Sequence, residues 1–193
     1  YQAPEDAMEI EVLAEQFAWN IRYPGDDGQF GETDNELVDE ENPFGIDEED
    51  SAAEDDVVTR GLIHVPVNVP VKVKLRSKDV IHSFFIPVLR IKQDALPGET
   101  IDAWFQAKET GEYHLVCAEL CGLGHTTMKA GFVVESLEEF QSWLEEKSES
   151  KKSIAKHLSS LRVTEELVEN VMEELKLDLD IIKWNREILL KIA

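Results

Sequence analysis

The chain has 193 residues, 42% of them apolar, which is enough for one sizeable core in a single domain with appendages. Its 41 acidic and 19 basic residues give a net charge of -22. This charge makes nucleic acid and anionic membrane surfaces poor partners and favours basic ones, by an attraction that acts mostly on the rate of encounter. No apolar run approaches the roughly 20 residues that span a bilayer, and no signal peptide is recognisable, so the printed sequence is expected to be soluble.

The first predicted element lies in residues 8–23, where apolar and polar side chains alternate in places. This pattern predicts one bent strand or two short ones, ended by a turn at Pro24 and Gly25.

An acidic segment follows at residues 26–56, which hold fifteen acidic residues and no Lys or Arg. Runs of like charge are usually solvated loops, so residues 36–56 are expected to be solvated and partly disordered. A docking surface for a basic protein is the alternative.

Residues 57–80 are rich in β-branched side chains, and Pro66 and Pro70 within them mark an edge or a turn between strands. Between residues 71 and 76, apolar side chains alternate with basic ones, as expected for a strand with one buried face. Further strands are predicted at residues 83–86, 100–107, 112–116 and 131–135. Many short strands separated by regular turns predict an all-β protein with a β-sandwich.

The C-terminal part is predicted to be helical. Ser136 and Glu139 form a capping box, which predicts a helix over residues 137–146 that packs Phe140, Trp143 and Leu144 on the sandwich. Residues 147–153 are expected to be a charged hinge. Beyond it, Leu167, Val171, Leu175, Leu179, Ile182, Ile188, Leu189 and Ile192 follow helical spacing. The prediction is therefore a domain at residues 1–146 and an amphipathic helical tail at 147–193, which either folds back and self-associates or docks on a partner subunit.

The most informative stretch is Cys117–Met128, which contains the only two cysteines of the chain, Cys117 and Cys121, together with His125 and Met128. Thiolate and thioether are soft ligands and imidazole is borderline, so the set favours copper over calcium or magnesium. A four-cysteine zinc or iron–sulfur site needs more thiols, and a mononuclear blue-copper site needs only one. Two thiolates spaced four residues apart could instead bridge two metals in a binuclear copper centre.

Simpler interpretations of this stretch remain open: a disulfide, buried unpaired thiols, a core histidine and a methionine that only packs. The close clustering of the four residues favours a metal site. Gly122 and Gly124 permit the sharp backbone path of a ligand loop.

A second imidazole ligand must come from elsewhere, and His82 is the best candidate because it follows a strand in an otherwise apolar segment. His64 and His114 lie within predicted strands, where they are expected to pack or face solvent. His157 lies in the charged tail.

Four stretches, Trp19–Pro24, Val80–Pro87, Gln93–Gly98 and Cys117–Met128, resemble the copper-A domain of cytochrome c oxidase subunit II. The resemblance covers roughly residues 8–146. It implies a cupredoxin-like Greek-key β-sandwich with a C-terminal helical extension, at the periplasmic face of the cytoplasmic membrane, and membrane helices that precede Tyr1.

The resemblance also implies a ligand set. Cys117 and Cys121 would bridge two copper ions, with His82 and His125 bound one to each. Met128 would be a weak axial ligand to one copper and the carbonyl oxygen of Glu119 the axial ligand to the other, while the Glu119 side chain could reach a magnesium ion at the interface with subunit I.

By the same resemblance, the domain would accept electrons from cytochrome c and pass them to haem in subunit I, where oxygen is reduced. Where the family often has Gln-Trp-aromatic-Trp, this chain has Gln16-Phe17-Ala18-Trp19, so the residue that receives the electron is in question. Phe17 and Trp19 are the candidates. The copper-A subunit of a nitric oxide reductase and a non-redox, disulfide-bonded binding module are the alternative functions.

Overall fold

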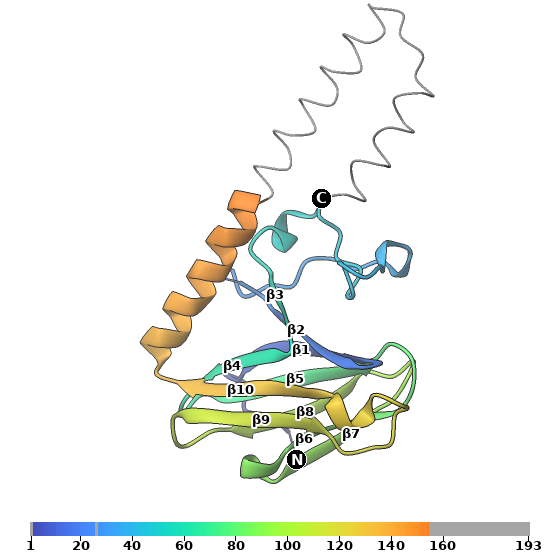
Figure 1. Cartoon of the computed structure of the whole chain (residues 1–193). Helices are drawn as coiled ribbons and strands as arrows, with labels where there is room; N and C mark the ends of the chain where they lie inside the picture. The colour runs from blue at the N-terminus through green and yellow to red at the C-terminus, as the bar shows by residue number, and fades with distance from the viewer. Residues whose placement is uncertain (1, 26, 155–193) are drawn as a thin grey trace, which may run out of the picture. The chain divides into compact units, whose positions relative to one another are not determined.

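The computed structural model describes residues 2–25 and 27–154, which form a sandwich of two five-stranded sheets (Figure 1). The first sheet has the order β3-β2-β1-β5-β8, with bounds β1 Met8–Glu15, β2 Ala18–Tyr23, β3 Val57–Arg60, β5 Pro70–Ser77 and β8 Ile101–Gln106. The second has the order β4-β10-β9-β6-β7, with bounds β4 Leu62–Pro66, β6 His82–Ile86, β7 Ile91–Ala95, β9 Gly111–Cys117 and β10 Lys129–Glu135. The predicted all-β sandwich is confirmed.

Strand pairing is antiparallel except for β1 with β5 and β10 with β4, which are parallel. Within the described residues, four short 3-10 helices lie in the connections: η1 Asn35–Leu37, η2 Ser51–Ala53, η3 Pro87–Leu89 and η4 His125–Thr127. The strand β7 was not predicted, because Lys92, Gln93 and Asp94 interrupt its apolar pattern. Backbone pairing with β6 stabilises this strand instead.

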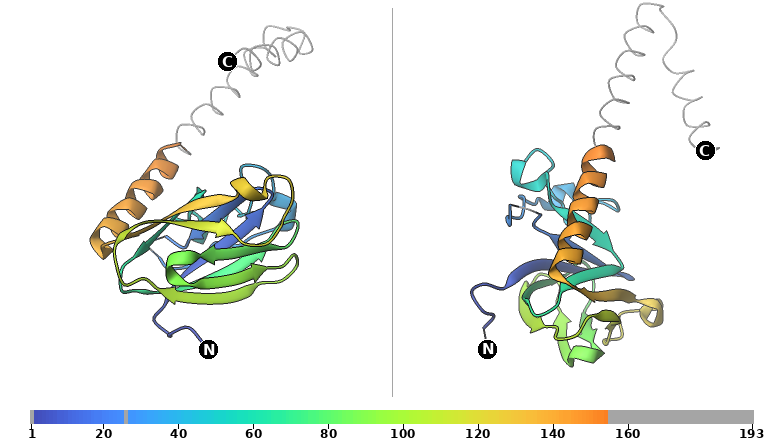
Figure 2. Two further views of the ribbon diagram at one scale, coloured as in Figure 1. Left: turned by 60° about the horizontal axis from the view of Figure 1, so that its bottom comes forward. Right: turned by 90° about the vertical axis from the view of Figure 1, so that its left-hand side faces the viewer.

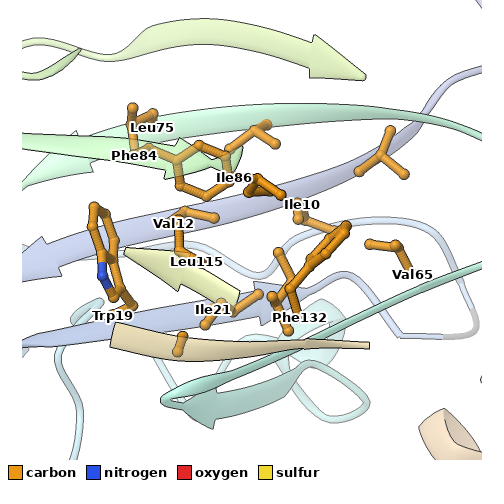
Figure 3. Packing of buried hydrophobic residues seen from close by; sticks show 14 of the residues in the cluster. Ile10, Val12, Trp19, Ile21, Val65, Leu75, Phe84, Ile86, Leu115 and Phe132 are labelled. Atoms are coloured by element: carbon orange, nitrogen blue, oxygen red, sulfur yellow. The ribbon is translucent and has the colours of Figure 1, made fainter. Parts of the chain in front are cut away.

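The core lies between the sheets and is built from alternate residues of each strand (Figure 3). On β5, Val71, Val73 and Leu75 are fully buried, while the basic residues between them face outward, as the alternation predicted. Trp19, Phe84 and Phe132 are among the largest fully buried side chains of this core. Phe84 meets Trp19 edge-on, with ring centroids 5.8 Å apart.

Part of the outer face of the first sheet is covered by the acidic segment, which lies on the side of β1 and β2 away from the second sheet (Figures 1 and 2). Leu13 on β1 forms a small second core with Phe44, Ile46 and Ala53. Most acidic side chains of the segment face solvent, as expected. The prediction of a partly disordered loop is wrong, because these apolar side chains attach the segment to the sheet.

An ion pair at the centre of this covered face also holds the segment. Arg22 is 1% exposed, and its Nε donates to the Asp56 carboxylate over 3.0 Å. Its other nitrogens donate to Glu11 over 3.1 Å and to the carbonyl oxygen of Gly31 over 2.7 Å. Asp56 has no exposed surface, so its carboxylate depends on the Arg22 guanidinium and on the N–H of Gly31, 3.1 Å away, to offset the loss of water.

The predicted capping box is confirmed: the backbone N–H of Ser136 donates to the Glu139 carboxylate over 2.9 Å, and the N–H of Glu139 donates back to the Ser136 hydroxyl. Phe140 and Trp143 pack on Tyr23, as predicted for this helix. Trp143 also stacks on His64, with ring centroids 4.1 Å apart.

The helix runs from residue 137 to residue 154, past its predicted end at residue 146, so residues 147–153 are helical. Their predicted role as a hinge stays a prediction. The Glu and Lys residues of this segment have high helix propensity, which exceeds the unfavourable contribution of its serines. The predicted amphipathic tail from Leu167 to Ile192 lies outside the described residues, and the proposed division at residue 146 therefore stays a prediction. Within the described part, no helix is long and apolar enough to cross a membrane.

We expect Asp56→Ala to lower the free energy of unfolding by about 3–5 kcal/mol, because it leaves the Arg22 charge buried without its main partner. Chemical denaturation monitored by tryptophan fluorescence measures this. Glu48→Ala is the matched control: it removes the same charge from an exposed position of the same segment and should change stability by less than about 0.5 kcal/mol. Equal losses in the two variants would contradict the structural role of the pair.

Candidate metal centre

The candidate centre forms where the start of β6 meets the end of β9. These strands pair with Phe84 opposite Cys117 and Phe85 opposite Val116. The N–H of Ala118 donates to the Ser83 carbonyl oxygen over 3.0 Å and extends this alignment. His82 therefore lies beside Cys117, with 4.0 Å between its Nδ1 and the Cys117 Sγ, although 35 residues separate them in the chain.

The two cysteines are free thiols, with their sulfurs 3.8 Å apart. A disulfide bond joins its sulfurs at about 2.05 Å, so the disulfide considered from the sequence is not present. Cys117 is 8% and Cys121 4% exposed, so both sulfurs lie at the edge of the core, shielded from solvent.

The remaining predicted residues converge on these sulfurs. The Sγ of Cys121 lies 3.6 Å from the Nδ1 of His125 and 3.7 Å from the Sδ of Met128. The Cys117 thiol donates to the carbonyl oxygen of Glu119 over 3.1 Å, whereas the Glu119 side chain is exposed. The structure thus places all six predicted residues around the two sulfurs, and their roles as metal ligands stay a prediction.

The ligand loop, residues 117–128, is shaped by its own backbone. The N–H of Cys117 donates to the carbonyl oxygen of Met128 over 3.1 Å and closes the loop. Within it, η4 places His125 one turn before Met128. Gly122 has a φ of +136°, which L side chains rarely adopt, so glycine is needed there.

A further residue, Asp79, contacts this site, and the sequence analysis did not identify it. The Asp79 carboxylate lies 2.8 Å from the Nε2 of His82, the ring nitrogen opposite the one that faces Cys117. Burial alone would raise the pKa of Asp79, but hydrogen bonds from His82 and from the N–H groups of Gln16 and Val80 hold it below its usual value. The position of Asp79 three residues before a histidine was the only signal in the sequence.

The two aromatic candidates for receiving the electron lie differently from what was expected. Trp19 has no exposed surface, so a donor does not touch it directly, and its ring fills the core beside His82, 6.2 Å away between centroids. Its role in receiving the electron stays a prediction. Phe17 is partly buried and lies over the ligand loop, next to Gly122 and Gly124. Of the two, Phe17 alone reaches the surface.

The Cys121 thiol is held in its protonated form. Burial, together with the hydrogen bond and charge of Cys117, raises the pKa of Cys121 to about 11. A metal that binds here must displace this proton, because thiolate is the binding form.

The donor set fits copper. His82, Cys117 and Cys121 each offer one ligand atom, and these atoms lie within 4.8 Å of one another. With the thioether of Met128, the set is soft to borderline and rich in sulfur, which suits copper rather than calcium or magnesium.

Comparison with known proteins agrees with this chemistry. Residues 8–137 match the family model described as cytochrome c oxidase subunit II, periplasmic domain. The chain belongs to this family. Membership of the family implies a copper-binding domain, and the family description places such domains in the periplasm.

Similar sequences carry the same family name. The chain is 42% identical over 144 residues to an alternative cytochrome c oxidase subunit 2 of Bradyrhizobium diazoefficiens, covering 74% of this chain and 52% of that protein. It is 37% identical over 176 residues to a cytochrome c oxidase subunit 2 of Thermostichus vulcanus, covering 88% and 44%. The chain thus spans about half the length of these relatives.

Solved structures support the fold. The crystal structure of the periplasmic domain of cytochrome oxidase subunit II from Bradyrhizobium japonicum is similar to this chain, with a TM-score of 0.57 and 30% sequence identity. The similarity covers 77% of this chain and 99% of that one. The sandwich is therefore the cupredoxin-like fold of this family, as expected.

In the metal-free protein, we expect Cys121 to react slowly with an alkylating reagent at pH 8, because a pKa of about 11 leaves only about one thiol in a thousand ionised. The rate should rise steeply towards pH 11. Cys117→Ala removes the hydrogen bond and the charge of Cys117 but leaves Cys121 buried. The alkylation rate should therefore begin to rise at a lower pH than in the unmodified chain, yet at a higher pH than for an exposed cysteine. Peptide mapping by mass spectrometry measures the rates. A profile unchanged by Cys117→Ala would contradict the coupling of the two thiols.

Proposed function

We propose that this chain is the electron-transfer domain of a terminal cytochrome c oxidase and that it holds a binuclear copper-A centre. The observation that carries the proposal is the pair of unjoined thiols 3.8 Å apart, with the Nδ1 of His82 4.0 Å from one sulfur and the Nδ1 of His125 3.6 Å from the other. Two sulfurs that each have an imidazole nearby suit two metals better than one.

In this proposal, Cys117 and Cys121 bridge two copper ions, and His82 and His125 bind one each. Met128 and the carbonyl oxygen of Glu119 are the weaker axial ligands. The copper pair, when bound, would supply one-electron redox chemistry spread over two nuclei.

The protein's own contribution is rigidity and exclusion of water. His82 has no exposed surface, and Met128 is 2% exposed. His82 begins β6, Cys117 ends β9 and Met128 directly precedes β10, three neighbouring inner strands of one sheet, while Cys121 and His125 lie on the loop between β9 and β10. Asp79 fixes the orientation of the His82 ring through its second nitrogen, as is usual for metal-binding histidines. A rigid site of this kind needs little rearrangement when an electron arrives or leaves.

The proposed electron donor is cytochrome c or another basic carrier, for which a chain with net charge -22 is suited. The proposed acceptor is haem in subunit I of the oxidase. Leu120 and Leu123 are 78% and 104% exposed on the ligand loop, which supports contact with a partner close to the site. The Glu119 side chain is exposed on the same loop, which is compatible with the predicted magnesium contact at a subunit I interface.

Copper reconstitution tests the proposal. We expect two copper ions per chain and a paramagnetic spectrum of one unpaired electron shared by two equivalent copper nuclei. Cys117→Ser and Cys121→Ser should each abolish this spectrum, because a hydroxyl cannot replace a bridging thiolate. A single copper with the spectrum of a mononuclear site in the unmodified chain would overturn the proposal.

Met128→Leu should leave copper bound and shift the reduction potential, because a weak axial ligand tunes the potential more than it holds the metal. Redox titration followed by absorption measures the shift. Met8→Leu, on β1 and outside the ligand set, is the control and should change neither quantity. Loss of all copper in Met128→Leu would show that the axial assignment is wrong.

A further inference from the structure

The turn between β1 and β2 contacts both halves of the metal centre through one residue, Gln16. Its side-chain Nε2 donates to the carbonyl oxygen of Cys121 over 2.6 Å. Its backbone N–H donates to the Asp79 carboxylate, also over 2.6 Å, and the other oxygen of that carboxylate lies 2.8 Å from the Nε2 of His82. Gln16 thus connects a ligand on the loop with a ligand on β6.

The next residue, Phe17, extends this contact. A Cβ atom added at Gly124 would lie 2.4 Å from the Cδ2 of Phe17, and one added at Gly122 would lie 3.0 Å from its Cζ. The ring therefore rests directly on the loop backbone, at a separation that only glycine allows. The turn and the loop are complementary in shape as well as in hydrogen bonding.

The middle of the ligand loop has little other support. Its ends are fixed by the bonds from Cys117 to Met128 and from Ala118 to Ser83, and η4 contributes bonds within the loop. Among residues 2–25 and 27–154, the bond from Gln16 is the one long-range hydrogen bond to residues 119–125. Leu120 and Leu123 are largely exposed and add little packing.

We propose that Gln16 is a positioning residue that holds the ligand loop in its metal-binding shape before any metal is present. It acts through the Cys121 backbone on one side and through Asp79 on the other, so it sets the separation of the Cys121 and His82 ligand atoms. Metal sites require their ligands to be held within a fraction of an ångström of the binding geometry, and such supporting contacts provide this. Only the copper measurements below rest on the proposed function.

The test compares two variants that remove the same kind of bond. Gln16→Met keeps the length of the side chain but cannot donate, and Gln16 is exposed, so the variant should fold. Gln106→Met is the control: the Nε2 of Gln106 also donates over 2.6 Å to a carbonyl oxygen, that of Asn68. Gln106 pairs with Pro70, the first residue of β5, so it lies at the other end of this strand from the ligand loop.

Amide hydrogen exchange in the metal-free, reduced protein is the first measurement. Loss of one hydrogen bond should speed exchange of the His125, Thr127 and Met128 amides about fivefold in Gln16→Met. The amides of β10 should not change, and Gln106→Met should exchange like the unmodified chain in the loop. Gln16→Lys, which keeps a donor of similar reach, should restore slow exchange. Unchanged loop exchange in Gln16→Met, or an equal increase in Gln106→Met, would overturn the proposal.

The copper-loaded protein supplies the second measurement. The absorption bands and the reduction potential should shift in Gln16→Met and stay unchanged in Gln106→Met, an effect that general destabilisation does not produce. Unshifted bands and potential in Gln16→Met would contradict positioning of the ligands. If the unmodified chain itself binds no copper pair, the proposed function fails, and the exchange comparison still decides the role of Gln16.

Discussion

The pairing of β6 with β9 is the contact on which the candidate centre depends. Only two residue pairs form it, Phe84 with Cys117 and Phe85 with Val116, yet they determine where His82 lies relative to the sulfurs. Phe84 is fully buried against Trp19, so the register of the pair is fixed by core packing. A slip of one residue would turn His82 to the opposite face of the sheet. The geometry of the site is in this sense a consequence of the hydrophobic core.

The two faces of the first sheet differ in composition and in what they contact. The inner face contributes Trp19, which packs beside His82. The outer face is charged, and its acidic and basic rows neutralise each other: Glu9 on β1 binds Lys72 and Lys74 on β5 at 3.1 Å and 2.5 Å. The acidic segment covers part of this face. Most of its carboxylates are exposed, while its apolar side chains keep it attached to the sheet.

Much of the site could be predicted from the sequence, because ligand chemistry is local. Cys117, Cys121, His125 and Met128 lie within one loop, and His82 stands out as a polar residue in an apolar segment. What could not be predicted depends on contacts between distant segments. Gln16 lies 105 residues before Cys121, and only the folded sandwich brings them together. The same limit applies to Phe44 and Ile46, which are two apolar residues among many acids. They pack on Leu13, and no local sequence pattern predicts this contact.

X-ray absorption at the copper edge of the reconstituted domain tests the central claim most directly. If two thiolates bridge two copper ions, each absorbing copper has sulfur and imidazole nitrogen as its nearest neighbours, together with a second copper at short distance. A spectrum with only nitrogen and oxygen neighbours, or with no copper–copper contribution, would contradict the account.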